Sequence, residues 1–187
     1  MADYNFVINV DLERLLDGIY KFPNIEIAVK KGIENGIEEL KDRIVEKLIE
    51  NISKYGLSNS LLASTINVEK LENGISINMG SDYAVFVEYG TGIIGSQNQH
   101  PNPARDGWIY DVNKHGENGW WYPSNSQDPN KNKYITEDGT ILAWTQGMRS
   151  RPFMYDTWLW ASRSANQIIV KRINRELEKE IRRNGGW

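Results

Sequence analysis

Between residues 23 and 56, apolar residues recur every three or four positions, and this repeat constrains the fold more than any other feature of the 187-residue chain. The residues on the repeat are Ile25, Val29, Ile33, Ile37, Leu40, Ile44, Leu48 and Ile52. Such a stripe predicts one amphipathic helix, roughly 45 Å long. Gly32 and Gly36 lie on or beside the stripe, and the charged residues around them exclude burial in lipid. We therefore expect this glycine pair to allow close packing against another element of the same fold.

A second long helix is predicted after Pro152, because proline favours the first turn of a helix. Apolar residues then return at helical spacing, at Met154, Trp158, Ala161, Ala165, Ile168, Ile169, Ile173, Leu177 and Ile181. Between the two helices, residues 65–69 and 75–79 alternate apolar and polar around a turn at 71–74, which predicts a β-hairpin with one buried face. Residues 83–89 fit either a third strand or a short helical turn. The predicted fold class is α+β, with two long helices packed on a small antiparallel sheet.

Residues 93–148 predict a long, irregular insertion within a single domain that spans residues 1–187. The insertion is rich in Trp, Gly and Asn, and all seven tryptophans of the chain lie at or beyond Trp108. Loops of this length are uncommon in compact domains and are usually functional. Two short strands are expected inside it, at 120–122 and 141–145. Because Trp is a favoured anchor of protein–protein contacts, the candidate interface residues are Trp108, Trp120, Trp121 and Trp144, with local core packing as the alternative.

The overall composition excludes several classes of protein. The chain has no cysteine, which excludes disulfides and thiolate metal sites. It has no apolar stretch of membrane-spanning length, and we expect neither a secretory signal nor a membrane partner. The net charge of −3 gives no reason to expect a nucleic-acid-binding protein. Residues 149–187, however, carry nine Lys and Arg against four acidic residues, a polarity that suits self-association or a charged partner.

No catalytic, cofactor-binding or metal-binding residue is predicted. Residues 90–95 match GxGxxG, but two prolines and no helical period follow, whereas a dinucleotide site needs a helix there. Residues 128–132 resemble the start of a calcium loop that lacks the required Gly and Glu further on. His100 and His115 fit no compact zinc pattern, and local hydrogen bonding explains them better. We therefore expect a protein that is not an enzyme, although a hydrolase without a familiar motif remains open.

Two short segments together resemble a known signature. The first is YAVFVEYGTG at residues 83–92, and the second is SRPFM at residues 150–154. In this order, and with a long helix on each side, they resemble the paired motifs of the tail-completion, or neck, family of minor structural proteins in long-tailed bacteriophages and prophages. The residues that carry the resemblance are Tyr83, Ala84, Glu88, Tyr89, Gly90, Thr91, Gly92, Arg151, Pro152 and Phe153. The likeness covers about residues 1–92 and 149–183 and leaves the insertion outside.

The residues themselves suggest how the two segments are joined. Glu88 stands where the chain turns at Gly90, and Arg151 directly precedes the predicted start of the second helix. A bidentate ion pair between Glu88 and Arg151 would fasten the turn to the helix start. We expect this pair to be structural and not catalytic.

The resemblance implies a virion component, made in the host bacterial cytoplasm and located at the neck. Such subunits form a ring around the DNA channel, of six copies to match the tail or twelve to match the connector. The implied partners are the head connector or head-closure protein and the tail tube or terminator protein, and DNA passes without sequence-specific binding. No cofactor is implied. A tail terminator or head-closure protein is the closest alternative, and a glycan-binding module that uses the Trp-rich insertion is an alternative of another class.

Overall fold

The computed structural model describes residues 5–9, 23–57, 66–71, 74–80, 82–102, 107–125 and 132–183. The chain forms two compact units, which we call the helical unit (Met1–Gly80 with Phe153–Trp187) and the inserted unit (Ser81–Pro152). The predicted α+β class is confirmed. The inserted unit begins at Ser81 and not at residue 93, so the first motif of the resemblance lies inside it.

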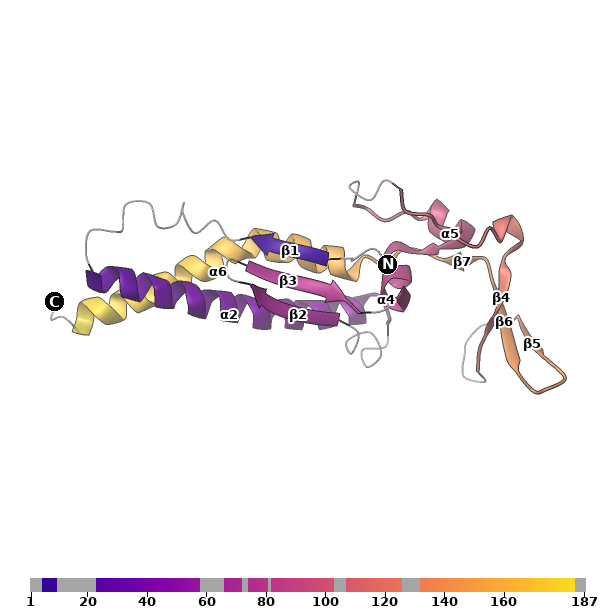
Figure 1. Cartoon of the computed structure of the whole chain (residues 1–187), viewed down its shortest axis with the longest axis horizontal. Helices are drawn as coiled ribbons and strands as arrows, with labels where there is room; N and C mark the ends of the chain where they lie inside the picture. The colour runs from indigo at the N-terminus through magenta and orange to yellow at the C-terminus, as the bar shows by residue number, and fades with distance from the viewer. Residues whose placement is uncertain are drawn as a thin grey trace. The chain divides into compact units, whose positions relative to one another are not determined.

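Two long helices dominate the helical unit: α2 (Pro23–Lys54) and α6 (Phe153–Arg183). Both were predicted, and they lie side by side (Figure 1). Their apolar stripes are buried, from Val29 to Ile52 on α2 and from Phe153 to Ile173 on α6. The helices run antiparallel, because Gly32 lies against Ile173 whereas the side chain of Asn51 reaches Thr157. Burial of the two stripes supplies most of the core of this unit.

The glycine pair of α2 lies where the two helices approach most closely. A Cβ atom on Gly32 would stand 2.5 Å from the Cα atom of Ile173, and one on Gly36 would stand 2.9 Å from the Cα atom of Ile169. Real side chains do not make contacts this short. The expected close packing against another element of the fold is confirmed.

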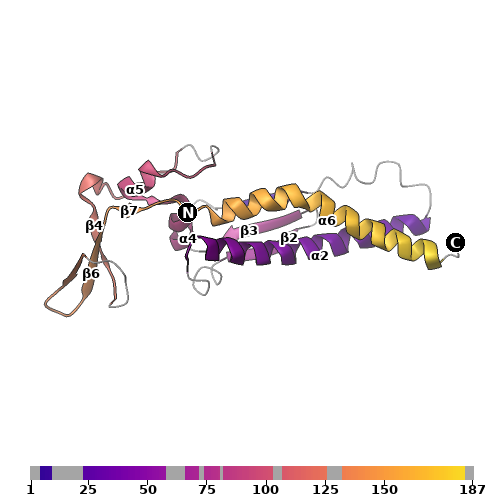
Figure 2. The same cartoon turned by 180° about the vertical axis from the view of Figure 1, so that it is seen from behind.

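A three-stranded antiparallel sheet covers one side of the helix pair, as the two opposite views show (Figures 1 and 2). Its order is β1 (Asn5–Asn9), β3 (Gly74–Met79), β2 (Ile66–Leu71). The hairpin of β2 and β3 confirms the prediction, whereas β1 was missed because a lone five-residue strand carries little periodicity. Phe6 and Ile77 are opposite each other in β1 and β3 and both are buried. The ring centroids of Phe6 and of Trp158 on α6 are 6.2 Å apart.

The inserted unit has regular structure of its own. Its elements are α4 (Asp82–Tyr89), α5 (Gly92–Gln97), η2 (Gly116–Asn118), β4 (Trp120–Pro123), β5 (Lys133–Ile135), β6 (Ile141–Thr145) and β7 (Gly147–Met148). The ambiguous residues 83–89 are thus helical. Both short strands predicted inside the insertion are confirmed as β4 and β6, which pair antiparallel, and β5 adds a third strand on the other edge of β6.

Candidate functional site

The two motifs of the resemblance meet within the inserted unit through main-chain contacts. The N–H of Arg151 donates to the carbonyl oxygen of Val87 at 3.0 Å, and the hydroxyl of Ser150 donates to that of Glu88 at 2.7 Å. Close by, Gly92 and Gly147 form an isolated antiparallel bridge with φ angles of 61° and 101°. A Cβ atom on Gly147 would stand 1.9 Å from the carbonyl oxygen of Thr91, so only glycine fits this approach.

The predicted ion pair between Glu88 and Arg151 is wrong. Among the ion pairs of the described residues none joins them, and the Glu88 carboxylate lies instead 3.0 Å from Nε2 of His100. Both side chains of this contact are almost fully buried, with 0% of Glu88 and 3% of His100 exposed. An imidazole makes fewer hydrogen bonds than a guanidinium with its five N–H groups, so it is easier to satisfy inside a small core. The main-chain N–H of Arg151, not its side chain, joins the motifs.

The tautomer of His100 follows from its second contact. The main-chain N–H of Asn102 donates to Nδ1 of His100 at 3.1 Å. Nδ1 is therefore a hydrogen-bond acceptor. Nε2 carries the hydrogen and donates a hydrogen bond to the Glu88 carboxylate. The sequence analysis treated His100 as a locally bonded loop residue and missed Glu88 as its partner, because no periodic pattern links two residues that stand twelve positions apart across Gly90 and Gly92.

The aromatic residues around this pair form the small core of the inserted unit. The ring of Tyr89 is buried between those of His100 and Trp108, at centroid distances of 4.5 and 5.0 Å. The indole N–H of Trp108 donates to the carbonyl oxygen of Gly90 at 3.0 Å. Trp108, one of the four candidate interface residues, thus follows the alternative of local core packing.

The remaining motif residues are mainly structural in position. Ala84 and Gly90 are buried in the inserted unit, Phe153 is fully buried at the start of α6, and Pro152 is half-buried directly before it. Tyr83 is the exception, because 46% of its surface is exposed. Its ring, on α4, lines a pocket.

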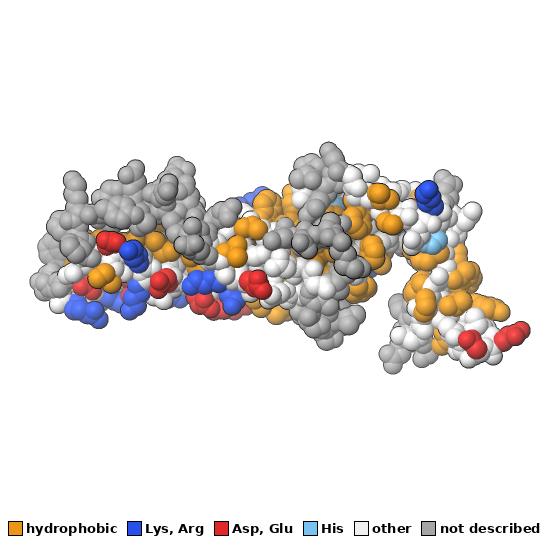
Figure 3. All heavy atoms as spheres, in the orientation of Figure 1, with side chains coloured by type: hydrophobic (Ala, Val, Ile, Leu, Met, Phe, Trp, Pro, Cys, Tyr) orange, Lys and Arg blue, Asp and Glu red, His pale blue; other side chains and the backbone are white. Residues whose placement is uncertain are grey.

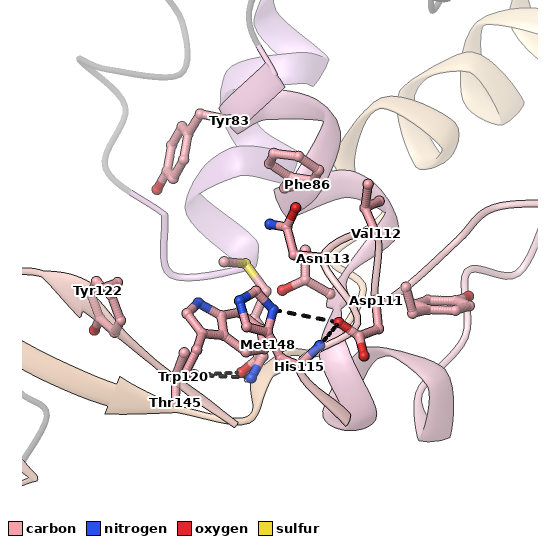
Figure 4. A pocket seen from close by; sticks show the side chains of 13 residues that line it. Tyr83, Phe86, Asp111, Val112, Asn113, His115, Trp120, Tyr122, Thr145 and Met148 are labelled. Carbon is pink, nitrogen blue, oxygen red and sulfur yellow. Dashed lines mark hydrogen bonds and ion pairs between the residues drawn. The ribbon is translucent and has the colours of Figure 1, made fainter. Parts of the chain in front are cut away.

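This pocket has a volume of about 630 Å³ and is built entirely within the inserted unit. Five aromatic side chains line it: Tyr83, Phe86, Tyr110, Trp120 and Tyr122. The polar lining residues are Thr91, Asp111, Asn113, His115 and Thr145. Figure 4 shows Tyr83 and Phe86 on α4 at one end and Trp120 with Thr145 at the other. A largely apolar pocket of this size with a few polar groups is typical of small-molecule sites.

Asp111 is held firmly at the edge of the pocket. Its two carboxylate oxygens accept the main-chain N–H groups of His115 at 2.8 Å and Gly116 at 2.7 Å. The N–H of Gly116 and then that of His115 keep the pKa of the Asp111 carboxyl below its usual value, so this group is ionised at neutral pH. The His115 ring stacks on Trp120 with centroids 4.6 Å apart. The sequence analysis weighed Asp111 only as a carboxylate near His115 in a zinc site that it rejected, and it missed Asn113; the available signal was an Asp, a residue that favours turns, four positions before His115-Gly116.

The other two candidate interface tryptophans lie on the opposite face of the β4–β6–β5 sheet from Trp120. Trp121 and Trp144 are direct partners in the register of β4 and β6, so their side chains share that face. Trp121 is 50% exposed and Tyr134 of β5 is 56% exposed. Figure 3 shows hydrophobic side chains gathered over this sheet. Trp121 and Trp144 also line a second, shallow pocket of about 470 Å³ with Asn132 and Lys133. We call this surface the outer aromatic face.

The described residues lack the features of three other classes of site. In the part of the chain that the structure describes, no group of three or more His, Asp or Glu residues could hold a metal ion. Across the same residues, no helix is both long and apolar enough to cross a bilayer. The GxGxxG match at residues 90–95 follows helix α4, where a dinucleotide site would have a strand. Comparison with protein-family models, with curated proteins and with solved structures found no match to this chain.

Proposed function

We propose that this chain is a structural subunit of the head–tail junction of a long-tailed bacteriophage or prophage, of the neck or tail-completion type. One observation carries the proposal. The two segments that resemble the paired motifs of that family are far apart in the sequence, yet the hydroxyl of Ser150 and the main-chain N–H of Arg151 in the second segment donate hydrogen bonds to main-chain carbonyl oxygens at the end of α4 in the first. Motifs that form one structural unit support the resemblance better than two unrelated matches would.

The chemistry of the motif residues supports a structural role. Glu88 is the one carboxylate of the two motifs, and it is fully buried against His100, out of reach of a substrate. Tyr89 is buried as well, and Gly92 allows a close main-chain approach. Residues that pack and turn the chain explain the motif without catalysis. We therefore propose a protein that acts through protein–protein contacts, without a reaction or a cofactor.

The outer aromatic face is the proposed docking surface. Trp121 and Tyr134 are each about half exposed on this face, with their ring centroids 6.4 Å apart, and such a pair of exposed aromatic side chains favours contact with another protein. The neighbour is another copy of this chain in a ring of six or twelve, or a connector or tail protein. A closed ring requires two different surfaces of each subunit to meet.

The position within the junction is the second part of the proposal. A tail terminator or a head-closure protein would share the ring and the contact chemistry, so neck or tail completion is separated from them by where the protein sits in the particle. Labelling of the subunit in intact virions, followed by electron microscopy, tests this. Label at the connector–tail boundary fits the proposal, whereas label within the connector fits head closure.

Disruption of the gene in a phage or prophage that encodes this chain tests the function itself. We expect free DNA-filled heads and free tails, with joined particles restored by the wild-type chain. The double variant Trp121→Ser/Tyr134→Ser should restore few joined particles. Ile109→Ser is the matched control, because Ile109 is 64% exposed in the same unit but belongs neither to the outer aromatic face nor to the pocket. Normal joined particles after disruption, or absence of the protein from purified virions, would refute the proposal.

A further inference from the structure

We propose that the 630 Å³ pocket of the inserted unit binds a short neutral saccharide. The inference concerns the pocket side of the β4–β6–β5 sheet and is independent of the outer aromatic face. Three properties of the lining carry it: exposed aromatic rings, a fixed carboxylate near an exposed amide, and the absence of Lys and Arg from the lining residues.

Several aromatic rings of the lining are partly exposed, although His115 stacks on Trp120. Tyr83 and Phe86, one turn apart on α4, are 46% and 37% exposed, and Trp120 and Tyr122 on β4 are half-exposed. The face of an aromatic ring carries partial negative charge. A pyranose ring presents several C–H groups with partial positive charge on one of its faces, so it stacks favourably on such rings. Rings at both ends of the pocket suit two stacked sugar units.

The polar groups match hydroxyls. Each oxygen of Asp111 accepts one main-chain N–H; Oδ1 also lies 3.4 Å from Nδ1 of His115, whereas Oδ2 has room for a further donor such as a ligand hydroxyl. Because these bonds hold the carboxylate in place, a ligand hydroxyl would meet an acceptor that is already oriented. Asn113 is exposed in the pocket and offers both a donor and an acceptor (Figure 4). Planar carboxylate and amide groups fit the spacing of hydroxyls on neighbouring sugar carbons.

The charge of the pocket selects the class of ligand. Among its thirteen lining residues, all within the described part of the chain, none is Lys or Arg, and Asp111 is negatively charged. An acidic sugar, a phosphate or a nucleic acid would meet a carboxylate without a cation to offset it. A purely apolar peptide side chain would cover Asp111 and Asn113 without hydrogen bonds, which costs binding energy. A neutral polyhydroxyl ligand satisfies both the rings and the polar groups.

Titration of the purified full-length protein with a panel of saccharides tests the inference. The panel holds neutral di- and trisaccharides of glucose, galactose, mannose and N-acetylglucosamine, with trigalacturonate as the anionic member. Calorimetry and the NMR signals of the tryptophan indole N–H groups report binding. We expect at least one neutral member to bind with a Kd of about 1 mM or tighter, and trigalacturonate not to bind.

Two neighbouring tryptophans provide a matched pair of variants. Trp120→Ala and Asn113→Ala should each weaken saccharide binding about tenfold, whereas Trp121→Ala, one residue away on the other sheet face, should change it less than about twofold. Circular dichroism checks that each variant is folded. If Trp120→Ala loses its fold, Trp120→Phe and Asn113→Ala carry the test.

Three results would overturn the inference. The first is that no neutral saccharide binds more tightly than about 10 mM. The second is that binding survives Asn113→Ala and Trp120→Phe unchanged. The third is that short Trp- or Leu-containing peptides bind in the pocket while saccharides do not, which would make it a seat for a protein anchor. None of these results would affect the test of head–tail joining, because that test counts joined particles and does not involve the pocket.

Discussion

Replacing Gly32 by alanine separates helix propensity from helix packing in one measurement. In an isolated helix, Gly→Ala stabilises by about 1 kcal/mol. In this protein the new Cβ atom would stand 2.5 Å from the Cα atom of Ile173, where ordinary van der Waals contact begins at 3.4 Å. The obstacle is main chain, which no rotamer change can move. Helices α2 and α6 would therefore have to separate by about 1 Å at this point.

We expect the net effect of Gly32→Ala to be a lower free energy of unfolding. Overpacking a core costs about 1–3 kcal/mol, and a collision with the main chain lies at the upper end of that range. After subtraction of the gain in propensity, Gly32→Ala should lower the free energy of unfolding by about 2 kcal/mol. Gly36→Ala, with its Cβ atom 2.9 Å from the Cα atom of Ile169, should cost less. Separation of the helices also loosens the buried side chains on either side of the contact.

Urea unfolding followed by the helical circular dichroism signal measures these changes. Asn35→Ala is the matched control, because Asn35 is exposed and lies between the two glycines on the same helix. It should stabilise by about 0.5 kcal/mol through propensity alone. If Gly32→Ala stabilised the protein by about 1 kcal/mol, as propensity alone predicts, then the close approach of α2 and α6 would be wrong.

Three further predictions concern buried polar contacts. His100→Ala should lower the free energy of unfolding by about 3 kcal/mol and Arg151→Ala by less than about 1 kcal/mol, because His100 and not Arg151 contacts the buried Glu88 carboxylate. Additive effects of Glu88→Gln and His100→Ala in a double-mutant cycle would contradict this. Asn51→Ala should cost about 1–2 kcal/mol in denaturant unfolding, since its amide donates to the Thr157 hydroxyl at 2.9 Å between α2 and α6, and an unchanged midpoint would count against that bond. Burial raises the pKa of Glu39, but hydrogen bonds from Arg172 and Arg43 lower it by more, to below 4.5. Its stabilising effect should be complete above the usual carboxyl pKa of 4.5 and lost as the pH falls through the lower, folded-state pKa. Glu39→Gln should therefore weaken the pH dependence of the unfolding free energy below pH 4.5, which urea titrations at several pH values would measure.

Local spacing was enough to predict the two long helices and the β2–β3 hairpin of the helical unit, though not β1. The repeat from Ile25 to Ile52 and the one after Pro152 predict α2 and α6 because each helix buries one stripe of its own residues. Two glycines four residues apart on the first stripe also predicted a close approach. Alternation around the turn at 71–74 predicted the β2–β3 hairpin for the same reason, since its partners are neighbours in the sequence.

The alternation of side chains along a strand also predicts that two neighbouring tryptophans differ in orientation. Residues 120–122 were predicted to be a strand, and successive side chains of a strand point to opposite faces. That rule already separates Trp120 from Trp121. The sequence alone, however, does not tell which of them faces the pocket and which lies on the outer aromatic face.

Contacts between distant segments were decided only by the tertiary structure. The sequence pairs the Glu88 carboxylate with neither His100 nor Arg151; in the structure the Tyr89 ring packs on His100, and Nε2 of that histidine lies 3.0 Å from Glu88. The pocket likewise draws its walls from α4, residues 110–115, β4 and the segment from Thr145 to Met148. Periodicity indicates which face of one element is buried. A pocket depends on how separate elements pack together, and no local sequence pattern specifies that packing.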